Sequence, residues 1–76
     1  RVAHDRRTRH LRVAESGPLA GRSVGELQGE GIHTLAIVRG DRQYEANPPF
    51  DRRLAAGDSL IVSGAAEPLR RLRERS

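Results

Sequence analysis

Turn-forming residues interrupt this sequence so often that each helix or strand it forms must be short. Glycine or proline occurs, among other places, at positions 17, 18, 29, 31, 40, 48, 49, 57 and 64. The mostly apolar runs 34–38 and 59–63 lie between such positions, and their length is typical of strands. A chain of 76 residues without cysteine has a small core and no disulfide to reinforce it. The sequence therefore predicts one small domain that gains stability by pairing with a copy of itself or with a larger protein.

The spacing of apolar and turn residues predicts four strands in an α+β domain. The strands are expected at 10–13, 34–38, 43–46 and 59–63. A hairpin turn at 39–42 would join the second strand to the third, and Gly64 would end the fourth. Asp58, in the turn before the fourth strand, is expected to accept backbone N–H groups.

Two short helices complete the predicted order β-α-β-β-β-α. Ser23 and Glu26 have the spacing of a capping box, which predicts that a helix begins at this point. Leu27 lies on the apolar side of that helix. Pro68 is tolerated in a first helical turn, so the second helix is expected near the C-terminal end of the sequence.

The net charge of +4 is confined to the start of the chain. Residues 1–12 contain five Arg and one Asp, whereas the remaining residues contain nine Arg and nine acids. We interpret residues 1–9 as a linker or the end of an upstream element, and residues 10–76 as a domain cut from a longer protein. A nucleic-acid-binding module that uses this Arg-rich arm is one alternative function. With one Tyr, one Phe and no Trp, the chain lacks aromatics that stack on bases, so we expect no nucleic-acid partner.

Residues that carry catalysis or hold metals occur without the spacing that those sites need. His4, His10 and His33 are not three or four residues apart, which gives a zinc site no support. The serines lie at predicted turn, cap and strand positions rather than beside a base. No apolar run approaches the roughly 18 residues of a membrane span. We therefore expect a cytoplasmic domain that is not an enzyme, holds no metal or cofactor of its own and does not insert into the membrane.

Three segments match, in order and at compatible spacing, the pattern of one known family. Residues 16–27 are similar to an opening of the form S-x-L-x-G-K/R-S/T-hydrophobic-x-x-L. Residues 35–40 are similar to a central strand that ends in Arg and Gly, and residues 54–64 to L-x-x-G-D-x-L-hydrophobic-V-x-G. The chain thereby resembles the TrkA-C (RCK-C) domain family. The positions that carry the structural motif are Gly21, Ser23, Leu27, Gly57 and Asp58.

The resemblance implies a function that composition alone does not indicate. Domains of this family are dimeric regulatory modules on the cytoplasmic side of potassium channels, potassium uptake systems or cation/proton antiporters, and they usually follow a Rossmann-type domain. The resemblance therefore implies a homodimer, a membrane channel or transporter subunit as partner, and an upstream Rossmann-type domain in the parent protein. A purely structural dimerisation domain is the second alternative.

Some members of the family bind cyclic di-AMP or ions between the two subunits. The positions that match their ligand contacts are Ile32, His33 and Thr34, at the start of the second strand, with Pro48 as a further candidate. Glu26 and Glu30 lie four residues apart on the predicted helix and could attract a cation instead. The resemblance thus implies a small regulatory ligand, a cyclic dinucleotide or a cation, at the dimer interface.

Overall fold

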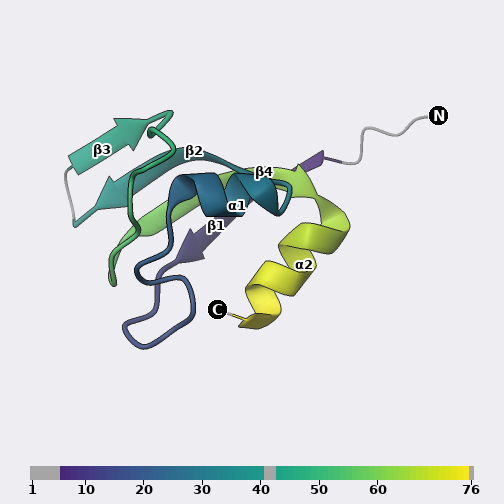
Figure 1. Ribbon diagram of the computed structural model, residues 1–76, viewed down its shortest axis with the longest axis horizontal. Coiled ribbons are helices and arrows are strands. Elements are labelled where there is room, and N and C mark those ends of the chain that lie inside the picture. The colour runs from purple at the N-terminus through teal and green to yellow at the C-terminus, as the bar shows by residue number, and fades with distance from the viewer. Residues whose placement is uncertain (1–5, 41–42, 76) are drawn as a thin grey trace.

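The computed structural model describes residues 6–40 and 43–75, which form four strands and two helices (Figure 1). The order β-α-β-β-β-α is the predicted one. The elements are β1 (Arg6–Arg12), α1 (Val24–Gly29), β2 (Ile32–Arg39), β3 (Gln43–Ala46), β4 (Ser59–Ala65) and α2 (Ala66–Arg75).

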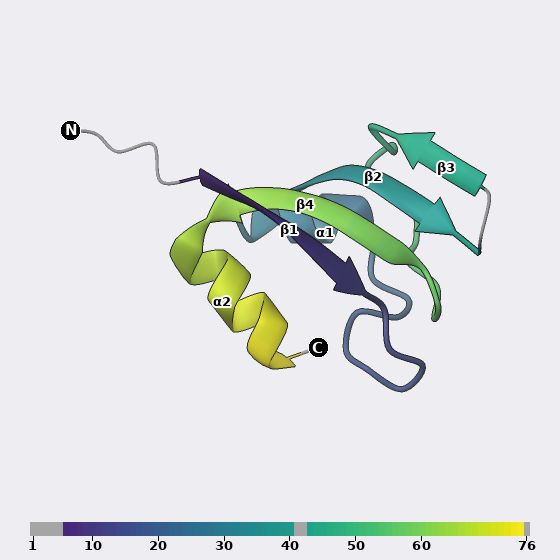
Figure 2. The ribbon, with the colours of Figure 1, turned by 180° about the vertical axis from the view of Figure 1, so that it is seen from behind.

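The strands form one antiparallel sheet in the order β1-β4-β2-β3. α1 packs on β2, and α2 packs on β4 and β1. In the view of Figure 2, β1 and β4 lie in front of α1, so α1 covers the far face of the sheet. β1 and β3 are the two edges of the sheet, on opposite sides of the domain. Among the described residues, no helix is long and apolar enough to cross a membrane.

The core lies between the sheet and the helices. Along β4, Leu60 and Val62 are fully buried, whereas Ile61 and Ser63, which alternate with them, are only half-buried. This alternation is expected for a strand with one face on the core. The buried cluster consists of Val13, Leu19, Val24, Leu27, Ile32, Ile37, Leu54, Leu60, Val62, Leu69 and Leu72.

The start of the chain differs from the prediction. Residues 6–9 were expected in a linker or at the end of an upstream element, but they belong to β1, where Arg6 to Arg9 pair with Ala65 to Val62 of β4. The pairing uses backbone groups, which do not require apolar side chains, and charged side chains are common on an edge strand. Residues 1–5 lie outside the described residues.

Gly64 continues β4 instead of ending it. It pairs with Ile32 on one side and with Arg7 on the other. A Cβ atom at this position would lie 2.9 Å from the carbonyl oxygen of Gly31 and 3.5 Å from Cγ of Leu69. Glycine is therefore needed because backbone and helix approach the strand closely, and not because the strand stops.

β2 is longer than predicted and contains an irregularity. Its register against β4 shifts between Thr34, opposite Val62, and Ala36, opposite Ile61. The extra residue alters the alternation, so that the neighbours Ala36 and Ile37 are both buried. The predicted pairing of β2 with β3 is confirmed; residues 41 and 42 of the predicted turn lie outside the described residues.

Candidate functional site

The N-terminus of α1 is held by a side chain and by a distant backbone segment. Ser23 is the N-cap, and its Oγ accepts the N–H of Glu26 at 3.2 Å, as the capping box predicted. The N–H of Gly25 donates to the carbonyl of Phe50 at 2.9 Å. A Cβ atom on Gly25 would lie only 3.2 Å from that carbonyl oxygen. The absence of a side chain there lets the segment around Phe50 lie directly against α1.

The other motif residues hold turns together. Gly21 and Gly57 have φ angles of 87° and 91°, which favour glycine. The N–H of Gly21 donates to the carbonyl of Leu54, which joins the segment before α1 to the segment before β4. Asp58 is 2% exposed, and its Oδ2 accepts the N–H of Ala55 at 3.0 Å, so its predicted role in the turn is confirmed. Leu27 lies in the core. The motif residues therefore have structural roles in turns, in the helix cap and in the core.

The predicted ligand contacts do not all reach the surface. Ile32 and Thr34 are 1% and 0% exposed, and Pro48 is buried beside β2, where the N–H of Asn47 donates to the carbonyl of Leu35 at 2.9 Å. His33 is exposed. Of the four, only His33 offers its side chain to a ligand without rearrangement, and the assignment of all four stays a prediction. The Oγ1 atom of Thr34 is buried with no hydrogen-bond partner among the described residues, a cost that native structures seldom carry.

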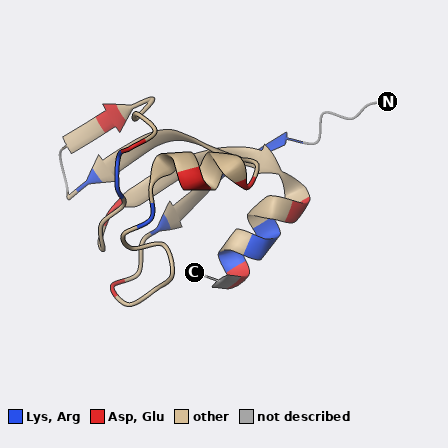
Figure 3. Ribbon diagram, viewed as in Figure 1, with Lys and Arg blue, Asp and Glu red and all other residues tan. Residues whose placement is uncertain are grey.

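The two acids of α1 are engaged by arginine. Arg22 lies 3.0 Å from Glu26 and 2.6 Å from Glu30, and Arg53 lies 3.6 Å from the other oxygen of Glu26. The hydrogen bonds to Glu30 and then to Glu26 raise the pKa of Arg22 above its ordinary value. We call Arg22, Glu26, Glu30 and Arg53 the α1 ion-pair cluster; the charged positions around α1 can be followed in Figure 3.

This cluster leaves little room for the cation considered from the sequence. A cation held by Glu26 and Glu30 would have to displace Arg22 from both carboxylates. Within residues 6–40 and 43–75, no group of three His, Asp or Glu side chains is placed to hold a metal ion. The charge at α1 is thus used for pairing within the domain.

Two exposed aromatic side chains were not predicted from the sequence. Tyr44 on β3 and Phe50 beside α1 are each 65% exposed, and they are the only aromatic residues among Phe, Trp and Tyr in the chain. An aromatic side chain left in water is a common feature of a protein interface. The scarcity of aromatics could have drawn attention to both positions, but their exposure was not evident from the pattern.

The structure is a small α+β domain with one antiparallel sheet, and comparison with known proteins gives its family. The family model described as the TrkA-C domain matches residues 9–76. The chain therefore belongs to the TrkA-C domain family, whose members are regulatory rather than catalytic domains. No curated protein matches the chain in sequence.

Two solved structures share the fold. The crystal structure of the GsuK RCK domain has a TM-score of 0.71 and 22% sequence identity, over 95% of this chain and 16% of that chain. The RCK_C domain dimer of S. agalactiae BusR in complex with c-di-AMP has a TM-score of 0.70 and 20% identity, over 90% of this chain and 92% of that chain. This chain thus spans about a sixth of the GsuK chain and nearly all of the BusR domain.

Proposed function

We propose that this chain is the dimeric, ligand-sensing regulatory domain of a potassium channel or of a potassium or cation transporter. The observation that carries the proposal is the match of the TrkA-C model over residues 9–76. The parent protein would supply an upstream Rossmann-type domain and act on a membrane subunit from the cytoplasmic side. A ligand bound between two copies would act on the gate only through a difference in affinity for two arrangements of the dimer.

The surface beside α1 is the best candidate for the dimer contact. Phe50 is wholly apolar and exposed, it lies against Gly25, and it is two residues from the ligand candidate Pro48. An aromatic side chain can bury roughly 150–250 Å² when a second copy covers it. The dimeric BusR domain has the same fold, which supports the pairing of two copies.

Phe50→Ser tests the dimer contact. Sedimentation equilibrium of the isolated chain is expected to show a dimer, and the substitution is expected to raise its dissociation constant about tenfold or more. Tyr44→Ser is the matched control, because it removes an equally exposed aromatic from β3, and its effect should stay within about twofold. A chain that remains a folded monomer at all concentrations would contradict the proposal.

The ligand is tested with cyclic di-AMP, since the BusR domain was solved in complex with it. Calorimetry is expected to give one ligand per two chains, together with a rise in melting temperature. His33→Ala should weaken binding about tenfold, whereas His10→Ala, which also removes an exposed strand histidine, should not. A dimer that binds neither cyclic di-AMP nor divalent cations would favour the purely structural dimerisation domain.

A further inference from the structure

The sheet has a second face that neither of the two described helices covers. Both helices pack on the same side, because Leu27 of α1 and Leu69 of α2 belong to one buried cluster. Figure 2 looks onto the other side, where no helix lies in front of β1, β4 or β2. We call this side of the sheet the open face. When one face of an antiparallel sheet is left to water, its residues are commonly polar, so the residues of the open face indicate whether it is left to water.

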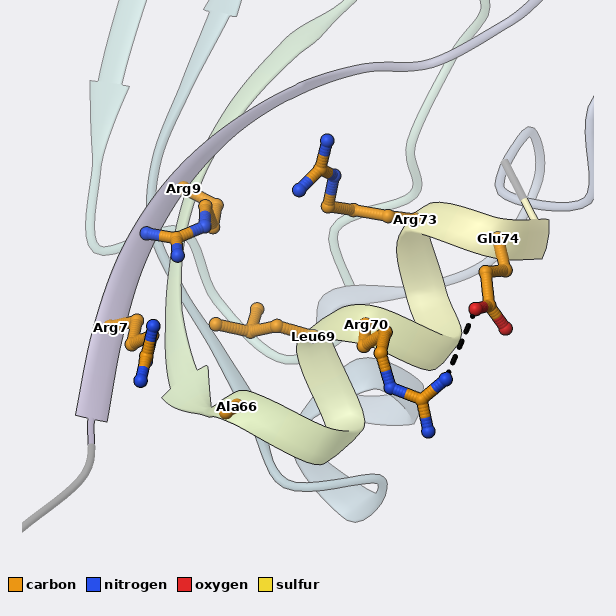
Figure 4. Close-up of a pocket in the computed structure, with 7 residues that line it drawn as sticks. All are labelled: Arg7, Arg9, Ala66, Leu69, Arg70, Arg73 and Glu74. Atoms are coloured by element: carbon orange, nitrogen blue, oxygen red, sulfur yellow. Dashed lines mark hydrogen bonds and ion pairs between the residues drawn. The ribbon is translucent and has the colours of Figure 1, made fainter.

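The residues of β1 divide between the two faces. Figure 4 shows Arg7 and Arg9 turned toward α2, on the helix side. Successive residues of a strand point to opposite faces, so the β1 residues of the open face are Arg6, Thr8, His10 and Arg12. The Nε of Arg6 donates to Oγ of Ser63 at 3.3 Å. Ser63 lies on β4 between two buried residues, so this hydrogen bond independently assigns Arg6 to the open face.

An apolar strip crosses the middle of the open face. Ile61 alternates with buried residues on β4, and its ladder partner on β2 is Ala36. Further along β2, Val38 lies opposite Tyr44 of β3, which is 65% exposed. Ile61 and Val38 are half-buried, yet within the described residues they are not among the side chains packed on the core cluster. The strip is therefore apolar surface that the domain does not cover itself.

The open face carries basic residues beside this strip and no acid. Arg6, His10 and Arg12 of β1 form one flank of the face. Glu45, the one acid within the described strands, lies opposite Ile37 of the core and thus on the helix side. The described strands therefore present both apolar surface and positive charge on the open face, with no carboxylate of their own to balance it.

We propose that the open face binds an acidic amphipathic helix of a partner protein. A sheet buries an apolar face against the apolar side of a helix, so the partner would cover Ile61, Val38 and Tyr44. Tyrosine is among the residues that contribute most at protein interfaces. The carboxylates of the partner would lie over Arg6 and Arg12, whose guanidinium groups bond carboxylates in pairs. This charge complementarity would fix the orientation of the helix on the sheet.

Two other occupants match the face less well. A second copy would cover Arg6 and Arg12 with a surface that has no acid at the described positions of its strands, and a cation covered without a partner is costly. A lipid bilayer requires apolar side chains that project beyond the cations. Val38 and Ile61 are instead half-buried between the strands, and arginine has a longer side chain. Charge and apolar surface lie side by side, as they do on a helix with one acidic flank.

The proposal goes beyond the regulatory function and does not rest on it. The proposed dimer contact, Phe50, lies beside α1 on the helix side. The ligand candidate His33 is near the start of β2, whereas Val38 is near its end. Arg12 belongs to the same row as Val38, because both are ladder partners of Ser59 on β4. Variants at Arg12 and Val38 therefore test the open face away from His33.

Arg12→Glu combined with Val38→Thr is the test variant. Threonine keeps the branched shape that suits a strand, while glutamate reverses the charge of the flank. Arg71→Glu, at an exposed position of α2, makes the same charge reversal on the helix side. Phe50→Ser removes an exposed apolar side chain from that side. Circular dichroism shows that each variant is folded.

The probe is a labelled helical peptide of leucine, alanine and glutamate, with the leucines on one side and the glutamates beside them. It has about 18 residues, because shorter helices are marginal in water. Comparison peptides carry lysine in place of glutamate or the same residues in scrambled order. Fluorescence anisotropy at fixed salt measures binding to the full chain. Phosphatidylglycerol vesicles and sedimentation equilibrium test the lipid and the second copy.

The acidic peptide is expected to bind about tenfold or more tightly than either comparison peptide. Its affinity should fall about tenfold or more in the test variant and about twofold or less in Arg71→Glu and in Phe50→Ser. No binding of the acidic peptide, equal binding of the lysine peptide, or equal weakening by Arg71→Glu would overturn the proposal. So would a test variant that loses vesicle binding or dimerisation but keeps the peptide. Loss of the dimer in Phe50→Ser with peptide binding intact separates this test from that of the regulatory function.

Discussion

The arginine side chains at the two ends of the domain have different surroundings. In the α1 ion-pair cluster, Arg22 and Arg53 face Glu26 and Glu30 at 2.6 to 3.6 Å. In the groove between β1 and α2, which we call the basic groove, the charged lining residues are Arg7, Arg9, Arg70, Arg73 and Glu74. The same residue type therefore forms a compact ion-pair cluster at one end of the domain and lines a groove at the other.

The arginines that give the chain its positive net charge lie partly in β1. From the sequence, the excess charge belongs to the first twelve residues, and residues 1–9 were interpreted as a linker or the end of an upstream element. In the structure, Arg7 and Arg9 are part of β1 and meet the arginines of α2. The arginines of the N-terminal segment are therefore part of the folded domain.

Leu69→Ala is expected to lower the free energy of unfolding more than any other variant considered, because Leu69 lines the basic groove and is also part of the core. Leu69 is buried in the same cluster as Leu27 at the α1 end. Removing a buried leucine side chain costs about 2–5 kcal/mol, a large share of the stability of a small domain. Urea unfolding followed by circular dichroism measures the loss.

Leu27→Ala is the matched comparison at the other end and should cost a similar amount. If Leu69→Ala cost less than about 1 kcal/mol while Leu27→Ala kept its full effect, α2 would pack independently of the core. The two ends would then not share one cooperative unit.

Gly64→Ala, at the end of the domain that carries the basic groove, is expected to lower the free energy of unfolding by about 1–3 kcal/mol, because its Cβ would lie 2.9 Å from a backbone oxygen. Gly29→Ala is the control at the α1 end. A Cβ there meets nothing within 4 Å, and alanine favours a helix over glycine by about 0.5–1 kcal/mol. Opposite changes in the urea midpoint are therefore expected, and destabilisation of both variants by the same amount would contradict the packing at Gly64.

Local chemistry made much of the fold predictable. Ser23 accepts the N–H of Glu26 and Asp58 accepts the N–H of Ala55, each three residues away, as the turn and cap patterns predicted. The start of β1 could not be predicted in this way, because residues 6–9 are ordered by a partner strand more than fifty residues later.

The candidate sites were less predictable, because each depends on residues from distant segments. The open face joins β1, β4 and β2 across the sheet, and Phe50 reaches α1 through the absence of a side chain on Gly25. No spacing in the sequence indicates either contact. The exposure of His33 beside the buried Ile32 and Thr34 follows from strand alternation, but the sequence did not show which face would be covered.

The smallest expected effects on stability come from removing one ion-paired arginine at each end of the domain. Arg22→Gln removes contacts to two carboxylates from a side chain that is 21% exposed, and we expect a loss of about 0.5–1 kcal/mol. Arg70→Gln removes two contacts from a side chain that is 59% exposed, and we expect no measurable change in the urea midpoint.

The pH dependence of the stability of Arg22→Gln follows from the direction in which the pKa of Arg22 is shifted in the folded state. Because the pKa of Arg22 is raised in the folded state, its stabilisation is complete below the ordinary pKa of arginine and is lost only as pH rises through the higher folded value. The difference between wild type and Arg22→Gln should therefore be constant from about pH 6 to pH 9 and should shrink in high salt. A larger loss for Arg70→Gln than for Arg22→Gln would show that the pairs of α2, and not the α1 ion-pair cluster, hold the charged surface together.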